Sequence, residues 1–271
     1  MADGGVVLPT TWHDAVRAEL GRVFRPPFEV PIVVVVNGLL MTGSWFLLPP
    51  HWKNALFSLH GTLAFAMVLA AWMMSDVPAT NLLGPDARRV VAALDDPVMF
   101  RRLLYAKNFV LWLFVAPLCT AIAIGVGVHA HDLVAMAFSI LAIVVMPFGA
   151  LGLTAWVGIR FPYHPIALNE RWAHRRRWRH MIVRWLTLAV TPYGLVPVVA
   201  SALLVPSLVL WASFAKHGLG ARLSDGEYAW GILVACALAV IGSIGGHRAG
   251  WRTARRRRAK LSAYLADPSL G

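Results

Sequence analysis

The chain has 271 residues, of which 58% are hydrophobic and only 14% are charged. A typical soluble chain is about half apolar and about a quarter charged. The mean hydropathy of +0.63 therefore excludes a disordered chain and argues against an ordinary soluble domain. The net charge is +12, from 25 Lys and Arg against 13 Asp and Glu. Both cysteines, Cys119 and Cys236, lie inside apolar runs, which is typical of small buried hydrophobic residues and not of a disulfide framework.

Six apolar stretches are long enough to cross a bilayer, whose hydrocarbon core requires about 20 residues of helix. They are 30–48, 55–74, 109–128, 133–158, 182–211 and 229–246. We therefore expect an all-α fold, a polytopic membrane helical bundle with six transmembrane helices that forms one transmembrane domain over residues 1–271. Pro192, Pro197 and Pro206 predict that the fifth helix is broken or strongly tilted.

The cations are distributed very unevenly between the loops. If the N-terminus is inside, three of the 25 Lys and Arg residues lie in outer loops, namely Lys53, Lys216 and Arg222, and the other 22 lie on the inner side. Short cytoplasmic loops carry such an excess, so we expect a multi-pass protein of the cytoplasmic membrane with both termini in the cytoplasm. Inner cations beside anionic membrane lipids account for the basic composition without a nucleic acid partner.

The segment 10–27, ahead of the first span, has helical periodicity. One side collects Trp12, Val16, Leu20, Val23 and Phe24, while Asp14, Arg17, Arg22 and Arg25 share much of the other side. This pattern predicts an amphipathic helix in the inner membrane interface. A frayed tail is the alternative.

The segment 75–108 between the second and third spans is long for a helix connection. Residues 81–86 have turn chemistry, Asp86 is placed to cap a helix over 87–94, and Asp95, Asp96 and Pro97 break that helix before the chain enters the third span. We expect a cytoplasmic docking loop that carries a short helix under the membrane. The basic loop 159–181 is interpreted either as membrane-surface adhesion or as a second docking helix, and 247–271 as a basic cytoplasmic tail.

Catalytic and metal-binding motifs are scarce. The sequence contains no G-x-x-x-x-G-K-[ST] loop, no H-E-x-x-H and no evident Ser-His-Asp set, so the chain has no ATP site of that kind and no obvious catalytic site. His60 and His247 are separated by most of the bilayer, so they cannot share a metal or haem, and each is interpreted as an interfacial or packing residue. The outer turn 129–132 has residue types that suit a metal, but three ligands in one turn rarely converge. Gly242 and Gly246 fit a small-xxx-small helix contact.

The sequence at 81–108, NLLGPDARRVVAALDDPVMFRRLLYAKN, resembles the inner loop of ABC-2-type exporter permeases, the membrane subunits of ATP-driven exporters. The matching positions are Asn81, Gly84, Asp86, Pro97, Arg101, Arg102, Leu103, Leu104, Lys107 and Asn108. The end of the fourth span, residues 158–163, is similar to the exit of the fourth span in that family.

The resemblance implies that a coupling helix near 86–96 sits in a cleft of a separate ATP-binding cassette ATPase. The expected docking residues are Asn81, Gly84, Asp86, Arg88, Arg89, Pro97, Arg101, Arg102 and Lys107. A second permease subunit, identical or different, completes the exporter, and the partner binds the ATP, so this chain needs no cofactor. Apolar spans with few polar lining residues favour a hydrophobic or amphipathic substrate.

Two other functions stay open at this point. One is an accessory or scaffold membrane protein that docks a cytoplasmic partner through its basic inner surface. The other is a membrane-embedded enzyme of lipid metabolism, which needs inner-face carboxylates such as Asp76, Asp86, Asp95, Asp96 and Glu170. A secondary carrier is less favoured, because no chain of intramembrane acids is present for proton coupling.

Overall fold

The computed structural model describes residues 8–25, 28–47, 49, 62–74, 77–162, 164, 179, 182–183, 186–187 and 225–267. Every regular element in this part of the chain is a helix, which confirms the all-helical class for the described residues. In chain order they are α1 (Trp12–Val23), α2 (Glu29–Leu47), α4 (Thr62–Met73), α5 (Val77–Thr80), the 3₁₀ turn η1 (Gly84–Asp86), α6 (Ala87–Ala93), α7 (Pro97–Ala130), α8 (Leu133–Arg160), α11 (Asp225–Arg256) and α12 (Arg258–Ala266). Most of the basic loop 159–181, of the predicted fifth span and of the outer segment 212–228 lies outside the described residues.

Three of the described helices are long and apolar enough to cross a membrane, namely α7, α8 and α11. They contain 34, 28 and 32 residues, and the bilayer core needs about 20. The chain is therefore a membrane protein, and the third, fourth and sixth predicted spans form helices of the required kind. The first predicted span is helical as α2, which contains a shorter apolar stretch, Val30–Ser44.

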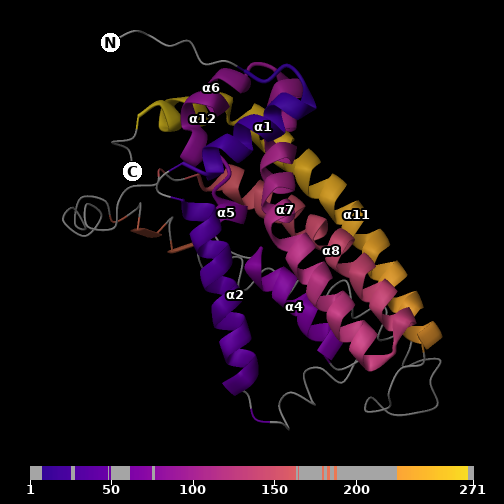
Figure 1. Ribbon diagram of the computed structural model, residues 1–271. Helices are drawn as coiled ribbons and strands as arrows, with labels where there is room; N and C mark the ends of the chain where they lie inside the picture. The colour runs from indigo at the N-terminus through magenta and orange to yellow at the C-terminus, as the bar shows by residue number, and fades with distance from the viewer. Residues whose placement is uncertain are drawn as a thin grey trace.

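The long helices lie side by side, and the short helices α1, α6 and α12 gather at one end of the bundle (Figure 1). α1, α6 and α12 lie where α7 begins and where α8 and α11 end. We call this the basic end. Its elements carry the following described cations: Arg17, Arg22, Arg88, Arg89, Arg101, Arg102, Lys107, Arg160, Arg248, Arg252, Arg255, Arg256, Arg257, Arg258 and Lys260.

At the other end of α7 and α8, a tight turn joins the two helices. His131 adopts a left-handed conformation with φ of 54°, and the Asp132 side chain accepts a hydrogen bond of 3.0 Å from the Ala135 amide. Histidine and aspartate therefore serve here as a C-cap and an N-cap. In the part of the chain that the structure describes, no three His, Cys, Asp or Glu side chains gather closely enough to hold a metal ion.

Glycines allow α8 and α11 to pack closely. A Cβ added at Gly152 would lie 2.7 Å from Ser243 Cα, and one at Gly246 would lie 2.4 Å from the carbonyl carbon of Gly152. A Cβ added at Gly149 would lie 2.9 Å from Ala239 Cα. The predicted Gly242 and Gly246 pair does lie at a helix contact, where its partner surface is formed by glycines of α8.

The interfacial segment forms α1, but its buried side differs from the predicted apolar side. Ala15, Glu19 and Val23 are buried, whereas Trp12 and Phe24 are 44% and 59% exposed. The reason is that α1 packs along α7, and Lys107 of α7 forms an ion pair with Glu19. Trp12 and Phe24 still contact α7 at its aromatic residues, with ring centroids 5.7 Å and 5.5 Å from Phe109 and Phe114.

A second apolar cluster, separate from the core of the long helices, organises the basic end. It joins Val90 of α6 and Phe100 of α7 to Leu261 and Leu265 of α12, all of them buried. The predicted basic tail therefore includes a helix, α12, which packs against Val90 of α6 and leaves Arg88 and Ala92 of α6 exposed.

Candidate functional site: a buried ion network at the basic end

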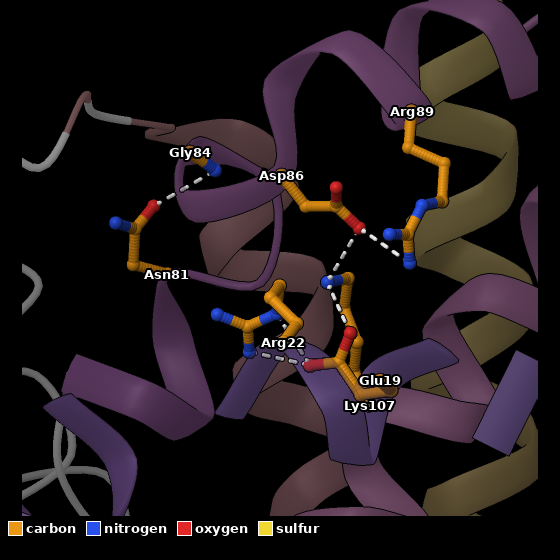
Figure 2. A network of polar contacts seen from close by, with 7 residues as sticks. All are labelled: Glu19, Arg22, Asn81, Gly84, Asp86, Arg89 and Lys107. Carbon is orange, nitrogen blue, oxygen red and sulfur yellow. Dashed lines mark hydrogen bonds and ion pairs between the residues drawn. The ribbon is translucent and has the colours of Figure 1, made fainter. Parts of the chain in front are cut away.

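Lys107 of α7 lies at the centre of a network of charges (Figure 2). Its Nζ donates to Oε2 of Glu19 on α1 at 2.9 Å and to Oδ2 of Asp86 in η1 at 3.2 Å. Arg22 Nε donates to the other Glu19 oxygen at 2.9 Å, and Arg89 lies 3.3 Å from Asp86. The residues Lys107 and Glu19 are only 4% and 2% exposed. Three segments distant in the sequence are thus joined by two carboxylates and three cations.

Burial and charge act on Glu19 in opposite directions. Burial is the largest single effect and raises the pKa of Glu19, but the charge of Lys107 and the hydrogen bond and charge of Arg22 together outweigh it. The pKa of Glu19 therefore falls to about 2 from the ordinary value of 4.5. Glu19 is ionised at neutral pH and holds Lys107 as a charge-assisted hydrogen bond acceptor.

The local sequence explains how Asp86 reaches the network. Asn81 Oδ1 accepts a hydrogen bond of 3.3 Å from the Gly84 amide, and Pro85 follows in the 3₁₀ turn η1. Asp86 occupies the N-cap position of α6, but its side chain makes no capping hydrogen bond. The predicted capping role of Asp86 is wrong, because the carboxylate turns to Lys107 and Arg89, which offer stronger ionic partners than a backbone amide.

The helix break after α6 follows the prediction. α6 ends at Ala93, and the Asp96 carboxylate accepts hydrogen bonds from the amides of Val98 and Met99, at 2.8 Å and 3.2 Å. Pro97 occupies the first turn of α7, where the missing amide hydrogen costs nothing. The break sets the direction of α7 and hence the position of Lys107 beneath α1.

The space beside the network is too small for a substrate. Glu19, Asn81 and Lys107 line a cavity of about 20 Å³, which is room for about one water molecule. In the part of the chain that the structure describes, the network joins segments around a space of about one water molecule.

A much larger open groove lies between the start of α6 and the end of α12. Its volume is about 680 Å³, and its lining includes Pro85, Arg88 and Val91 near α6, His164 beyond α8, and Leu265 of α12. His164 is held there by a 2.8 Å contact between its Nε2 and the Tyr264 carbonyl oxygen. We call this the α6–α12 groove.

Of the predicted docking residues, Gly84, Asp86 and Arg88 line the α6–α12 groove. Arg88 is exposed there, and Pro97 is exposed at the start of α7. Asn81, Gly84 and Lys107 are buried, and Asp86 and Arg89 are half-buried in the ion network. Arg101 and Arg102 lie elsewhere on α7 and do not line this groove. A docking role for each of them stays a prediction, but the internal contacts account for Asn81, Asp86, Arg89 and Lys107 without a partner.

The carboxylates considered for an enzyme also have internal contacts where the structure describes them. Asp86 binds Lys107, Asp95 forms an ion pair with Arg258 of α12, and Asp96 caps α7. Asp76 and Glu170 lie outside the described residues.

Next to Lys107, a polar cluster crosslinks the three long helices. Asn108 Nδ2 lies 3.3 Å from the Leu151 carbonyl oxygen and 2.9 Å from His247 Nε2, while His247 Nδ1 lies 2.8 Å from the Ser243 carbonyl oxygen. The Tyr105 ring stacks on His247 with centroids 4.3 Å apart. This confirms that His247 is a packing residue.

Glu19 is the network member that the sequence reasoning missed. At 100° per residue it lies about 20° from Trp12 and about 40° from Val23 on the helical wheel, just beyond the edge of the apolar side of α1. An acid at the edge of the apolar side of an amphipathic helix is the signal that predicts a buried cation partner.

No protein-family model, no curated protein and no solved structure matches this chain.

Proposed function

We propose that the chain is the membrane permease subunit of an ABC-2-type exporter. In this proposal six helices span the cytoplasmic membrane, the basic end faces the cytoplasm, and α6 is the coupling helix. A separate ATPase subunit hydrolyses ATP, and a second permease subunit completes the path for a hydrophobic or amphipathic substrate.

The observation that carries this proposal is the link between α6 and the long helices. Asp86, at the start of α6, binds Lys107 of α7, and Lys107 binds Glu19 of α1. Separating any of these buried charges from its partners costs several kcal/mol, about 3–5 for loss of one partner. A displacement of α6 is therefore transmitted to α1 and α7. An exporter needs such a transmission, because its ATPase must move the membrane helices from the cytoplasmic side.

The α6–α12 groove supports a docking role for the same helix. Its lining includes the exposed cation Arg88, and α12, which lines the groove with Leu265, also carries the exposed cations Arg258 and Lys260. Opposite charge steers association and suppresses wrong partners, so the expected partner surface is an acidic cleft.

The test is purification of the chain in mild detergent from cells that also produce its partners, with mass spectrometry of the bound subunits. We expect an ATP-binding cassette subunit in equal amount. Arg88→Glu should weaken its retention about tenfold or more, because like charges then meet in the groove. Arg17→Glu is the matched control, since it reverses an exposed charge on α1, at the same end but outside the groove, and it should retain the subunit.

Two results would contradict the proposal: no nucleotide-binding subunit is retained, or the Arg17 variant loses the subunit and the Arg88 variant keeps it. A scaffold protein would use the same groove. If a partner binds but its ATP hydrolysis is the same with and without this chain, the scaffold function replaces the exporter function.

A further inference from the structure

A second open groove, about 530 Å³ in volume, runs along α7. At one end it is lined by Val98, Arg101 and Arg102, which precede the apolar stretch of this helix. Further along it is lined by Tyr105, Phe109 and Phe148, with Trp12 of α1 at the side. We call it the α1–α7 groove.

The two ends of this groove have opposite chemistry. Arg101 and Phe109 are separated by about 12 Å along α7, from a rise of 1.5 Å per residue. Beyond Tyr105 the lining rings of Trp12, Phe109 and Phe148 belong to a chain of aromatic contacts that also includes Trp112. Centroids of Trp12 and Phe109, of Phe109 and Trp112, and of Trp112 and Phe148 lie 5.7, 5.5 and 5.7 Å apart.

The arginines at the charged end are held in place without using all their donors. Arg102 Nη1 donates to the carbonyl oxygens of Pro9, at 3.2 Å, and of Thr10. Arg101 Nε donates to the Pro97 carbonyl oxygen at 3.1 Å, and its guanidinium lies 5.6 Å from the Trp251 ring centroid. A guanidinium has five N–H donors, so these contacts leave Nη2 of each residue for an anion.

We propose that the α1–α7 groove binds one anionic phospholipid of the surrounding membrane. The phosphate sits between Arg101 and Arg102, because the fork of a guanidinium matches the geometry of phosphate oxygens. An acyl chain lies along Tyr105, Phe109 and Phe148, at the level where the apolar stretch of α7 begins. A free phosphate would use the arginine end alone and leave the aromatic end without a partner, so the shape of the groove favours a lipid.

This site is separate from the α6–α12 groove, since the two linings share no residue, and it assigns Arg101 and Arg102 to a lipid in place of the ATPase contact that the resemblance implies. A lipid bound here contacts α1, α7 and α8 together. It would hold together α1 and α7, which the Lys107 network also joins.

The experiment is native mass spectrometry of the full chain in detergent. The protein is titrated with phosphatidylglycerol or with phosphatidylcholine of the same acyl chains, and in a third arm with phosphatidylglycerol in the presence of inorganic phosphate. We expect one phosphatidylglycerol to be retained in preference to phosphatidylcholine, with inorganic phosphate at equal concentration failing to displace it.

Two variants and a matched control locate the site. The double variant Arg101→Gln, Arg102→Gln should weaken phosphatidylglycerol binding by about tenfold or more, because it removes charge-assisted hydrogen bonds. Val98→Trp should weaken it similarly by filling the charged end. Val98 is 53% exposed, so this variant keeps both arginines and the fold. Arg88→Gln removes a cation outside the groove and should bind as the wild type does.

The proposal is overturned if the two lipids bind equally, or if Arg88→Gln weakens binding as much as the double variant. It is also overturned if Val98→Trp binds like the wild type. Displacement of the lipid by inorganic phosphate would assign the site to free phosphate and would overturn the lipid assignment.

Discussion

Replacing Lys107 with methionine should destabilise the protein more than any other single Lys→Met change at the basic end. Methionine is similar in length and apolar, so the packing is kept while the ammonium is removed. Glu19 and Asp86 then remain buried at the positions where their oxygens lay 2.9 and 3.2 Å from Nζ. Each retains one arginine, but both lose the cation between them.

The expected loss is about 3–5 kcal/mol in the free energy of unfolding, the usual cost of removing one partner from a buried ion pair. Lys260→Met is the matched control, because Lys260 is exposed on α12. A surface change of that kind is expected to stay within about 0.5 kcal/mol.

The assay is a double-mutant cycle of Lys107→Met with Glu19→Gln, measured by unfolding in detergent micelles. Because Glu19→Gln removes one of the orphaned charges, the double variant should be less destabilised than the sum of the single variants by about 1 kcal/mol or more. Strictly additive single effects, or a Lys107 variant as stable as the Lys260 variant, would refute the reasoning about the network.

Two further predictions concern pH and helix packing. The pKa of Glu19 is about 2 in the folded protein and 4.5 in the unfolded chain. The ionised carboxylate therefore stabilises the fold by about 3 kcal/mol above pH 4.5, and this stabilisation is lost as the pH falls towards 2. The difference in unfolding free energy between wild type and Glu19→Gln should shrink over this range, and a constant difference would refute the prediction. Gly246→Ala should lower the unfolding temperature, because its Cβ would lie 2.4 Å from the Gly152 backbone at a cost of about 1–3 kcal/mol. Gly245→Ala, next to it on α11 with nothing within 4 Å, should leave the temperature unchanged or raise it, and equal effects of the two changes would contradict close packing of α8 on α11.

Hydrophobicity was enough to predict the long helices. A helix that crosses a membrane needs about 20 apolar residues in a row, and such a run can be recognised from neighbouring residues in the sequence. The break between α6 and α7 was also predictable, since Asp96 and Pro97 form a strong helix start by themselves. These features depend on neighbouring residues alone.

The partners within the basic end depend on contacts between distant segments, and single-sequence reasoning did not find them. Lys107, as one more cation ahead of a span, is explained equally well by the positive-inside tendency. The pairing with Glu19 joins residues 88 positions apart. Asp86 was misassigned because a capping aspartate and an ion-paired aspartate look alike in sequence.

The sequence contains a helical signal for α12, but the basic composition around it made the signal hard to recognise. Leu261, Tyr264 and Leu265 have the spacing of one helix face, but the run of arginines before them favoured interpretation as a charged tail. The close contact made by the glycines of α8 was not predicted either, because of their spacing. Gly149 and Gly152 are three residues apart, and the expected pattern for helix contacts has a spacing of four.

The account requires that α6 lie in the cytoplasm, where an ATPase can reach it, and cysteine labelling tests this most directly. Ala92→Cys places an exposed thiol on α6, and His129→Cys places one at the opposite end of α7, while the native Cys119 and Cys236 are buried. In intact cells a membrane-impermeant maleimide should label the His129 variant, and it should label the Ala92 variant only after the cells are permeabilised. Labelling of the Ala92 variant in intact cells would put α6 outside the cell and contradict the proposed function.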